Sequence, residues 1–212
     1  MWHKPYGLYE KYIKRPQDFV CALLAIIMFT PVMLVIAVLV WIKLGVPILF
    51  IQERPGRKGM PFKLYKFRTM IPAKSGIIDS AQDAQRLTSF GKKLRSTSLD
   101  ELPELFNILK GDMAIVGPRP LLTQYLSRYD DYQARRHEVR PGLTGLAQVH
   151  GRNSISWEDK FRWDVRYVDH ITFLGDWEII FETVMAVIKR EGISASGEAT
   201  AGEFLGNKEN KS

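Results

Sequence analysis

The amino-acid sequence predicts a membrane-associated α+β fold of the monotopic type, with a re-entrant N-terminal membrane helix, a small β-hairpin and amphipathic interfacial helices. A charge-free run of 24 residues from Phe19 to Ile42 supplies the membrane element. A turn rich in proline and glycine separates two short apolar stretches within residues 46–70, as in a hairpin. Apolar residues three and four apart within 156–190 predict amphipathic helices.

Length, charge and cysteine content limit the class of protein. The 212 residues suffice for one domain with an appendage. The expected division is a basic and aromatic juxtamembrane segment (1–18), the membrane helix (19–43), a main domain (44–193) and a polar C-terminal tail (194–212). The net charge of +7 points to an anionic partner, whether nucleic acid, phospholipid headgroups or a phosphorylated substrate. The single cysteine, Cys21, excludes an internal disulfide and a cysteine-based metal cluster.

The membrane element is expected to bend at Thr30-Pro31. A straight helix over residues 19–42 is roughly 36 Å long, enough to cross a bilayer. Pro31 cannot donate to the carbonyl of Ile27, and the Thr30 hydroxyl is close enough to serve backbone groups freed at the bend. Because basic residues flank the run on both sides, a single pass would leave one cluster on the wrong side of the membrane. We therefore predict a re-entrant helix preceded by a membrane-interface collar; a kinked single-pass helix is the alternative.

A β-hairpin is expected next, with strands over residues 46–52 and 62–70. Strand side chains alternate, so Lys66 and Arg68 share a face and are placed to grip one phosphate group. The alternative for these residues is a solvated or headgroup-facing edge. Residues 71–88 are expected to form a mobile loop.

The segment from Ser98 to Phe106 places two adjacent carboxylates, Asp100 and Glu101, at the expected start of a short helix. Proline is tolerated in the first turn of a helix, so Pro103 favours Asp100 as the N-cap residue. Pro103 then occupies the third helical position and offers no N–H, which leaves the Asp100 carboxylate partly free. Such paired acids suit phosphoryl chemistry, as ligands of a divalent cation or as a nucleophile. The alternative is a capping box of Ser98 and Glu101.

Two later stretches carry arginine on a restrained or glycine-rich backbone. In residues 117–120, Pro118 and Pro120 restrict the backbone around Arg119, which suits a phosphate clamp; a turn with a solvent-facing arginine is the alternative. The glycine-punctuated loop 140–152 has an arginine at each end but matches neither a dinucleotide fingerprint nor a P-loop.

Three further segments are expected to be helical: 120–137, 156–170 and 176–190. Segment 156–170 mixes aromatic and basic residues, so it is either an interfacial or a core-facing helix. Segment 176–190 repeats the pattern, with Trp177 and Phe181 on its apolar face. From residue 194 onward the chain is small, polar and expected to be disordered.

Taken together, four ordered motifs resemble those of the bacterial sugar transferase family. In order and spacing they are similar to those of its smallest members, the monotopic phosphoglycosyl transferases. The motifs occupy residues 63–70, 98–103, 117–120 and 140–149. Four motifs in order are far more specific than any one of them. Family members carry a re-entrant helix with a Ser-Pro or similar break, which Thr30-Pro31 matches in kind. One departure is His150, where many relatives carry asparagine.

The resemblance implies transfer of a sugar 1-phosphate from a UDP-sugar to polyprenyl (undecaprenyl) phosphate, with release of UMP, at the cytoplasmic face of the bacterial inner membrane. It implies that Asp100 attacks the phosphorus bearing the sugar and that Asp100 and Glu101 hold Mg²⁺. The residues it implies for phosphate or substrate binding are Arg119, Lys66, Arg68, Arg95, Arg140, Gln148 and Arg152. Donors with N-acetylated sugars are expected, such as UDP-N,N'-diacetylbacillosamine, UDP-GlcNAc or UDP-GalNAc, and no nucleic-acid partner.

Three alternatives remain open from the sequence. Within enzymes, the acceptor attacks the donor directly in a ternary complex and Asp100 serves only as a metal ligand. In a second class, the chain is a membrane-tethered basic module that binds nucleic acid or lipid without catalysis. In a third, it is a structural anchor in which Asp100, Glu101 and Arg119 are freely replaceable.

Overall fold

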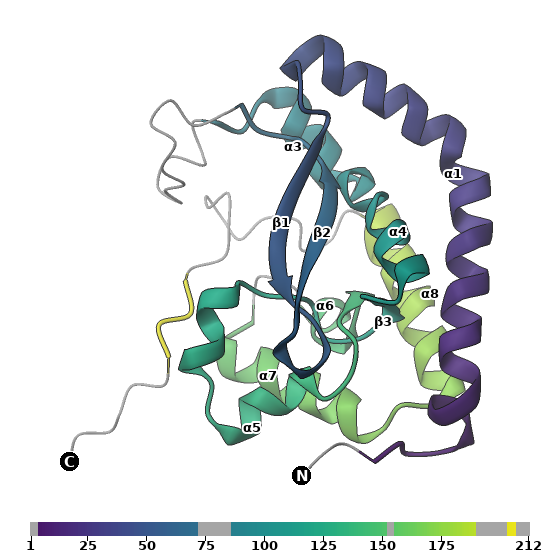
Figure 1. Ribbon diagram of the computed structural model, residues 1–212, viewed down its shortest axis with the longest axis vertical. Coiled ribbons are helices and arrows are strands. Elements are labelled where there is room, and N and C mark those ends of the chain that lie inside the picture. Colours follow the sequence, from purple (N-terminus) through teal and green to yellow (C-terminus); the bar gives the residue numbers. More distant parts are fainter. Residues whose placement is uncertain (1–3, 72–85, 152–154, 190–202, 207–212) are drawn as a thin grey trace.

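The computed structural model describes residues 4–71, 86–151, 155–189 and 203–206. A long N-terminal helix runs along one side of a helix-rich body with two small sheets (Figure 1). The elements in chain order are η1 (Tyr9–Ile13), α1 (Lys14–Leu44), β1 (Leu49–Pro55), η2 (Arg57–Gly59), β2 (Pro61–Phe67), α3 (Ser89–Ser96), η3 (Leu99–Glu101), α4 (Glu104–Lys110), β3 (Ala114–Val116), η4 (Thr123–Arg128), α5 (Asp131–Ala134), η5 (Arg135–His137), β4 (Gly142–Thr144), α6 (Leu146–Val149), α7 (Trp157–Asp169) and α8 (Phe173–Lys189).

Helix α1 continues through Pro31 without interruption. Figure 1 shows that it bends part-way along and leans over the end of the hairpin at which β1 begins. The Thr30 hydroxyl donates to the carbonyl of Ile26 at 2.6 Å, not to that of Ile27. The expected break is therefore a bend within one helix.

Most of α1 is not covered by the rest of the chain. Ile27 and Met28 are each 64% exposed and Leu34 is 63% exposed, where a core helix would bury such side chains. The helical stretch from Tyr9 to Leu44 is long and apolar enough to cross a membrane. These features support membrane association.

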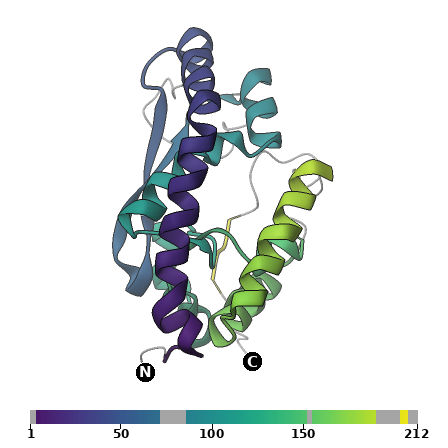
Figure 2. The same ribbon diagram turned by 90° about the vertical axis from the view of Figure 1, so that its right-hand side faces the viewer.

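The basic residues at the start of α1 bind the body of the protein. Lys14 Nζ lies 2.6 Å from Asp176 Oδ2 of α8. Arg15 donates to the carbonyls of Ile108 and Leu109, at 2.7 and 3.0 Å, near the end of α4. Lys14 and Arg15, which belong to the expected membrane-interface collar, thus dock α1 against the body. Figure 2 shows α1 and α8 close together at their N-terminal ends and diverging beyond them.

The predicted hairpin is confirmed, with strand bounds that differ from expectation. Strands β1 and β2 pair antiparallel, with Leu49 opposite Phe67 and Pro55 opposite Pro61. A second sheet pairs β3 and β4 in parallel, which brings residues 114–116 beside 142–144. The arginine motif at 117–120 follows β3 directly, so this second sheet sets where the motif begins.

Asn107 joins α4 to the outer edge of β2. Its side chain is fully buried; Oδ1 accepts from the backbone N–H of Tyr65 at 3.1 Å, and Nδ2 donates to the carbonyl of Lys63 at 2.7 Å. The amide thus bonds two backbone groups of β2 as a further strand would. This contact holds Lys66, on β2, opposite the acidic residues that precede and begin α4.

The two long C-terminal helices differ in what they bury. Helix α7 places Phe161, Val165 and Val168 in the core, each at most 1% exposed, so the core-facing alternative is correct and the interfacial expectation is wrong. Helix α8 buries Ile179 but leaves a row of large apolar side chains exposed: Phe173, Leu174, Trp177, Phe181, Val184 and Ile188. An exposed apolar row of this kind is what the expected interfacial helix would carry.

Two other expectations are wrong in part. Segment 120–137 is three short helical pieces, because Asp130 begins a new helix by forming a capping box with Gln133. The tail was expected to be disordered from residue 194, yet Phe204 is packed into the protein and only 4% exposed. Most of the expected mobile loop at 71–88 lies outside the described residues.

Candidate active site

Asp100 and Glu101 lie in η3, a single 3₁₀ turn. Ser98 precedes this turn with φ of 55°, a left-handed conformation that is uncommon for residues other than glycine. Helix α4 begins at Glu104 with Pro103 as its N-cap, and Ser98 makes no capping hydrogen bond. The N-cap expectation for Asp100 and the capping-box alternative are both wrong, because the chain makes a further turn before α4.

One carboxylate oxygen of Glu101 accepts hydrogen bonds from two cationic side chains that lie far apart in the sequence. Glu101 Oε1 accepts from Lys66 Nζ at 2.8 Å and from Arg119 Nη2 at 2.6 Å. Lys66 also lies 2.9 Å from Glu104 Oε1, so its ammonium bridges two carboxylates. Strand β2, the start of α4 and the segment after β3 therefore converge on the acidic doublet.

The two carboxylates of the doublet are in different electrostatic states. Burial and the charge of Glu101 raise the pKa of Asp100 to about 6, against the opposing charges of Lys66, Arg95 and Arg119. Burial acts to raise the pKa of Glu101 too, but Arg119 and Lys66 outweigh it and hold that pKa well below its usual range. In the described part of the chain no hydrogen bond occupies the Asp100 carboxylate. Near neutral pH Asp100 is thus mostly ionised and unbonded, as a nucleophilic carboxylate must be.

Arg119 is held by its backbone and presents its side chain to solvent. The backbones of Gly117 and Gly142 lie so close together that a Cβ added at Gly142 would lie 2.1 Å from the Gly117 nitrogen. This packing fixes the course of the backbone that leads to Arg119. The Arg119 carbonyl accepts from Arg136 Nη2 at 2.7 Å, and Arg136 pairs with the buried Asp164 at the same distance. The Arg119 side chain remains 43% exposed. The backbone of Arg119 is thus held in place, and its exposed side chain is open to an anionic ligand.

A family model described as bacterial sugar transferase matches residues 9–190. The chain belongs to the bacterial sugar transferase family. A relative of this transferase is EpsL of Bacillus subtilis, an uncharacterized sugar transferase, which is 47% identical over 92% of this chain and 96% of its own length. The undecaprenyl-phosphate galactose phosphotransferase of Salmonella typhimurium is 35% identical over 86% of this chain and 42% of its own.

A third relative is the UDP-glucose:undecaprenyl-phosphate glucose-1-phosphate transferase of Klebsiella pneumoniae, which is 40% identical over 81% of this chain and 39% of its own length. The chain therefore spans less than half of the Salmonella and Klebsiella proteins and nearly the whole of EpsL.

Of the other basic residues implied for the transferase site, Arg95 lies near the doublet and Arg68 is engaged elsewhere. Arg95 Nε donates to Thr69 Oγ1 at 3.0 Å, and its charge acts on Asp100. Arg68 instead donates to the carbonyls of Leu44, Gly45 and Val46 at the end of α1. The expectation that Lys66 and Arg68 grip the same phosphate does not fit this arrangement, because the two side chains bind different partners.

In the glycine-rich loop 140–152, Arg140 and Gln148 donate hydrogen bonds to backbone carbonyls of the protein itself. Arg140 Nε donates to the carbonyl of Gly111, which follows the last residue of α4, at 2.9 Å, whereas the doublet precedes the first residue of that helix. Gln148 Nε2 donates to the carbonyl of Leu143 at 3.1 Å. Arg152 lies outside the described residues. His150, the departure from the family pattern, packs its ring against Trp163 with centroids 4.0 Å apart.

Sequence reasoning assigned no role to two residues at this site. Glu104 is 3% exposed, and burial raises its pKa to about 7 although Lys66 opposes the rise. Arg54, whose Nε is buried without a partner, has its pKa lowered to about 10 by burial and by Arg119. Glu104 was detectable as a third acid within five residues of Asp100. Arg54 had no sequence signal beyond its charge.

Asp100 and Glu101 are also the candidate ligands of a metal ion. Among the described residues, no group of three or more His, Cys, Asp or Glu side chains is placed to hold a metal ion. Mg²⁺ at nucleotide sites commonly takes only one or two carboxylates and completes its shell with phosphate oxygens and water. The unbonded carboxylate of Asp100 beside Glu101 fits that kind of site.

Proposed function

We propose that this transferase moves a sugar 1-phosphate from a UDP-sugar to polyprenyl phosphate through a covalent intermediate on Asp100. The relatives from Salmonella and Klebsiella carry names that describe undecaprenyl-phosphate sugar phosphotransferases. The observation that carries the proposal is an ionisable, unbonded carboxylate next to one that binds two cations. A membrane-tethered module that binds nucleic acid or lipid without catalysis, an alternative left open by the sequence, does not explain this pair of carboxylates.

In the first step, an oxygen of the Asp100 carboxylate attacks the phosphorus bonded to the sugar. The bond from that phosphorus to the bridging oxygen breaks, and UMP leaves with the electron pair. In the second step, a phosphate oxygen of the lipid acceptor attacks the same phosphorus. The bond to Asp100 breaks, which yields the polyprenyl diphosphate sugar and restores the carboxylate.

The basic residues bring together groups that repel each other. Donor diphosphate, acceptor phosphate and Asp100 are all anionic, so positive charge is needed where they meet. Arg119, partly exposed and anchored through its backbone, is placed to contact phosphate oxygens. Lys66 holds Glu101 and Glu104 and keeps cationic charge beside Asp100. Asp100 and Glu101 would hold Mg²⁺, which when bound polarises phosphate oxygens and offsets their charge.

We further infer that α1 is re-entrant and keeps both ends on the side of the catalytic body. Lys14 and Arg15 join its N-terminal end to α8 and α4, and Arg68 binds the carbonyls that end it. A single pass across the bilayer would separate these two ends by the membrane thickness. The exposed apolar face of α8 then rests in the interface, and the site lies at the cytoplasmic face of the inner membrane, where a lipid phosphate is accessible.

The covalent route is tested by trapping. Purified protein in detergent is incubated with UDP-sugar labelled in the sugar, without acceptor, and then denatured. Wild type should retain label and release UMP, and Asp100→Asn should do neither. Glu158→Gln, on the exposed face of α7, is the matched control and should behave as wild type. UMP release only when acceptor is present, with no retained label, would support direct attack in a ternary complex.

Donor choice is open between hexoses and N-acetylated sugars. The names of the Salmonella and Klebsiella relatives specify galactose and glucose. A relative from Aeromonas hydrophila is named for N-acetylgalactosamine, in line with the N-acetylated donors that the motif resemblance suggested. A UMP-release panel with UDP-glucose, UDP-galactose, UDP-GlcNAc, UDP-GalNAc and UDP-N,N'-diacetylbacillosamine, each with undecaprenyl phosphate, identifies the substrate.

The topology is tested by cysteine labelling. Lys4→Cys in a Cys21→Ser background should react with a membrane-impermeant maleimide only from the cytoplasmic side, as should the control Glu158→Cys. Labelling of residue 4 from the periplasmic side would refute the re-entrant arrangement.

A further inference from the structure

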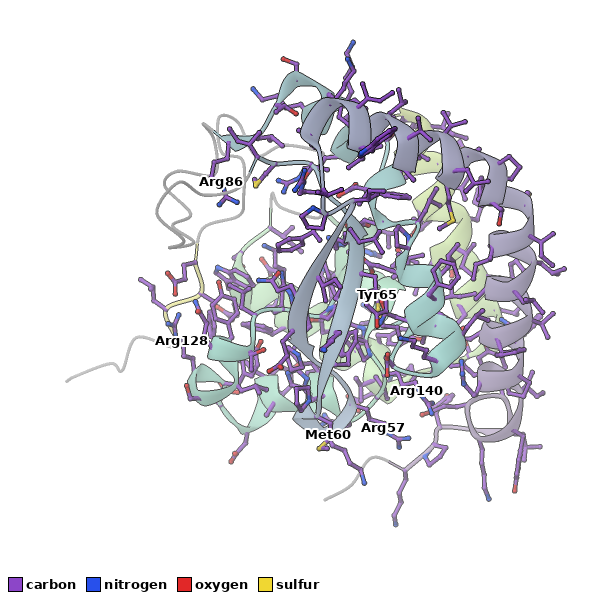
Figure 3. The ribbon with its side chains drawn as sticks, turned by 45° about the horizontal axis from the view of Figure 1, so that its top comes forward. Arg57, Met60, Tyr65, Arg86, Arg128 and Arg140 are labelled. Atoms are coloured by element: carbon purple, nitrogen blue, oxygen red, sulfur yellow. The ribbon has the colours of Figure 1, made fainter. Side chains whose placement is uncertain are left out.

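The C-terminal segment Glu203–Gly206 docks against the body of the protein. Figure 1 draws it in yellow beside the helices that follow the arginine motif, far from α1. Figure 3 places Arg128, the last residue of η4, next to this segment. The segment lies beyond residues 9–190, so it is not part of the region that defines the family.

Phe204 fills a socket made of four aromatic residues, Tyr125, Tyr129, Trp157 and Phe161, hereafter the aromatic socket. The ring centroid of Phe204 lies 5.0 Å from Phe161, 5.6 Å from Trp157, and 5.7 Å from both tyrosines. These separations are those of favourable edge-to-face and offset-stacked pairs. An otherwise polar tail thus inserts one aromatic side chain into a matching site.

Polar contacts fix the orientation of the segment. Glu203 Oε1 accepts from Arg128 Nη1 at 2.8 Å and from Gln124 Nε2 at 2.9 Å. The backbone N–H of Phe204 donates to the Tyr125 hydroxyl at 3.3 Å, and its carbonyl accepts from Arg128. The site therefore recognises an acidic residue followed by an aromatic one, in a defined direction.

The aromatic socket is connected to the active site through Arg136. The Tyr129 ring stacks on Phe204, and its hydroxyl accepts from Arg136 Nη1 at 3.3 Å. Arg136 Nη2 donates to the carbonyl of Arg119 at 2.7 Å, and Arg119 binds Glu101. Side chains in contact link the tail to the cation beside the acidic doublet.

We propose that η4 and α7 form a docking site for the chain's own segment Glu203–Gly206, and that Phe204 is a positioning residue for Arg119. With the segment docked, residues 120–129, which include η4, are held in place and Arg136 holds the Arg119 backbone. Without it the socket loses its central ring and residues 120–129 loosen. The kinetic part of the proposal rests on the proposed function; the docking part does not.

The test compares full-length Phe204→Ala with Leu205→Ala, whose side chain is 80% exposed. Hydrogen exchange of residues 119–129 should quicken in Phe204→Ala alone. Its kcat should fall about tenfold or more because Arg119 is misplaced. A peptide of residues 200–208 added to this variant should restore both readouts, and the same peptide with alanine for Phe204 should not.

Each other result overturns part of the proposal. Unchanged exchange in Phe204→Ala overturns the docking. Faster exchange and a lower melting temperature with unchanged kcat overturn the positioning role. Rescue of Phe204→Ala by added Asp100→Asn protein would show that a second copy supplies the segment, against the occupant proposed. If wild type releases no UMP from any UDP-sugar, the proposed function fails, and hydrogen exchange still decides whether the segment docks.

Discussion

Replacing Asn107 by alanine should separate α4 from β2 and weaken both fold and catalysis. The side chain is fully buried and bonds the Tyr65 N–H and the Lys63 carbonyl, and alanine leaves both backbone groups without partners. A buried polar group that loses its partner costs about 1–3 kcal/mol. Two such groups give an expected loss of about 3 kcal/mol in the free energy of unfolding. Lys66 would shift relative to Glu101, so kcat should fall as well.

The assay is equilibrium urea unfolding in mild detergent, with UMP release measured on the same preparations. Lys110→Ala is the matched control, because Lys110 lies on the same helix and its hydrogen bond to the Tyr65 hydroxyl and its contact with the Tyr65 ring are at the surface. This control should stay within about 0.5 kcal/mol of wild type. An Asn107→Ala protein that unfolds at the wild-type urea concentration with an unchanged slope would refute the idea that this amide joins α4 to β2.

Four more outcomes are expected. The Asp100 carboxylate is reactive only when ionised, and its pKa is raised to about 6, so kcat/KM should fall as pH drops through about 6. Lys66→Gln removes a charge that lowers this pKa, so in a pH–rate profile the fall should move to higher pH. Asp176→Asn leaves Lys14 buried and without its closest partner, and should cost about 3 kcal/mol in thermal unfolding of detergent-solubilised protein. Gly142→Ala should lower kcat and stability together, because a methyl group there overlaps the backbone before Arg119, and kinetics with circular dichroism will measure both.

Several basic residues make contacts within the protein rather than with a ligand. Lys14, Arg15 and Arg68 attach the two ends of α1, and Arg136 supports the Arg119 backbone. Lys66, Arg95 and Arg119 act on the charge of Asp100 and are incompletely buried, and of these Lys66 is paired with both Glu101 and Glu104.

The elements that depend on local pattern were predictable. The apolar run gave the membrane helix, the proline-glycine turn gave the hairpin, and the adjacency of Asp100 and Glu101 gave the candidate nucleophile and its partner. Even here, boundaries moved by several residues. The first turn of α4 could not be placed, because Ser98 takes a left-handed conformation that its residue type does not signal.

The sequence alone therefore determined the membrane anchor, the hairpin and the acidic pair, since each arises from neighbours along the chain. Tertiary structure decided that Lys66 and Arg119 meet on one oxygen of Glu101, that Arg68 turns to the end of α1, and that Phe204 is buried. The physical reason is that periodicity and turn chemistry act over a few residues. Which of many cations reaches a given carboxylate, in contrast, depends on how distant segments pack.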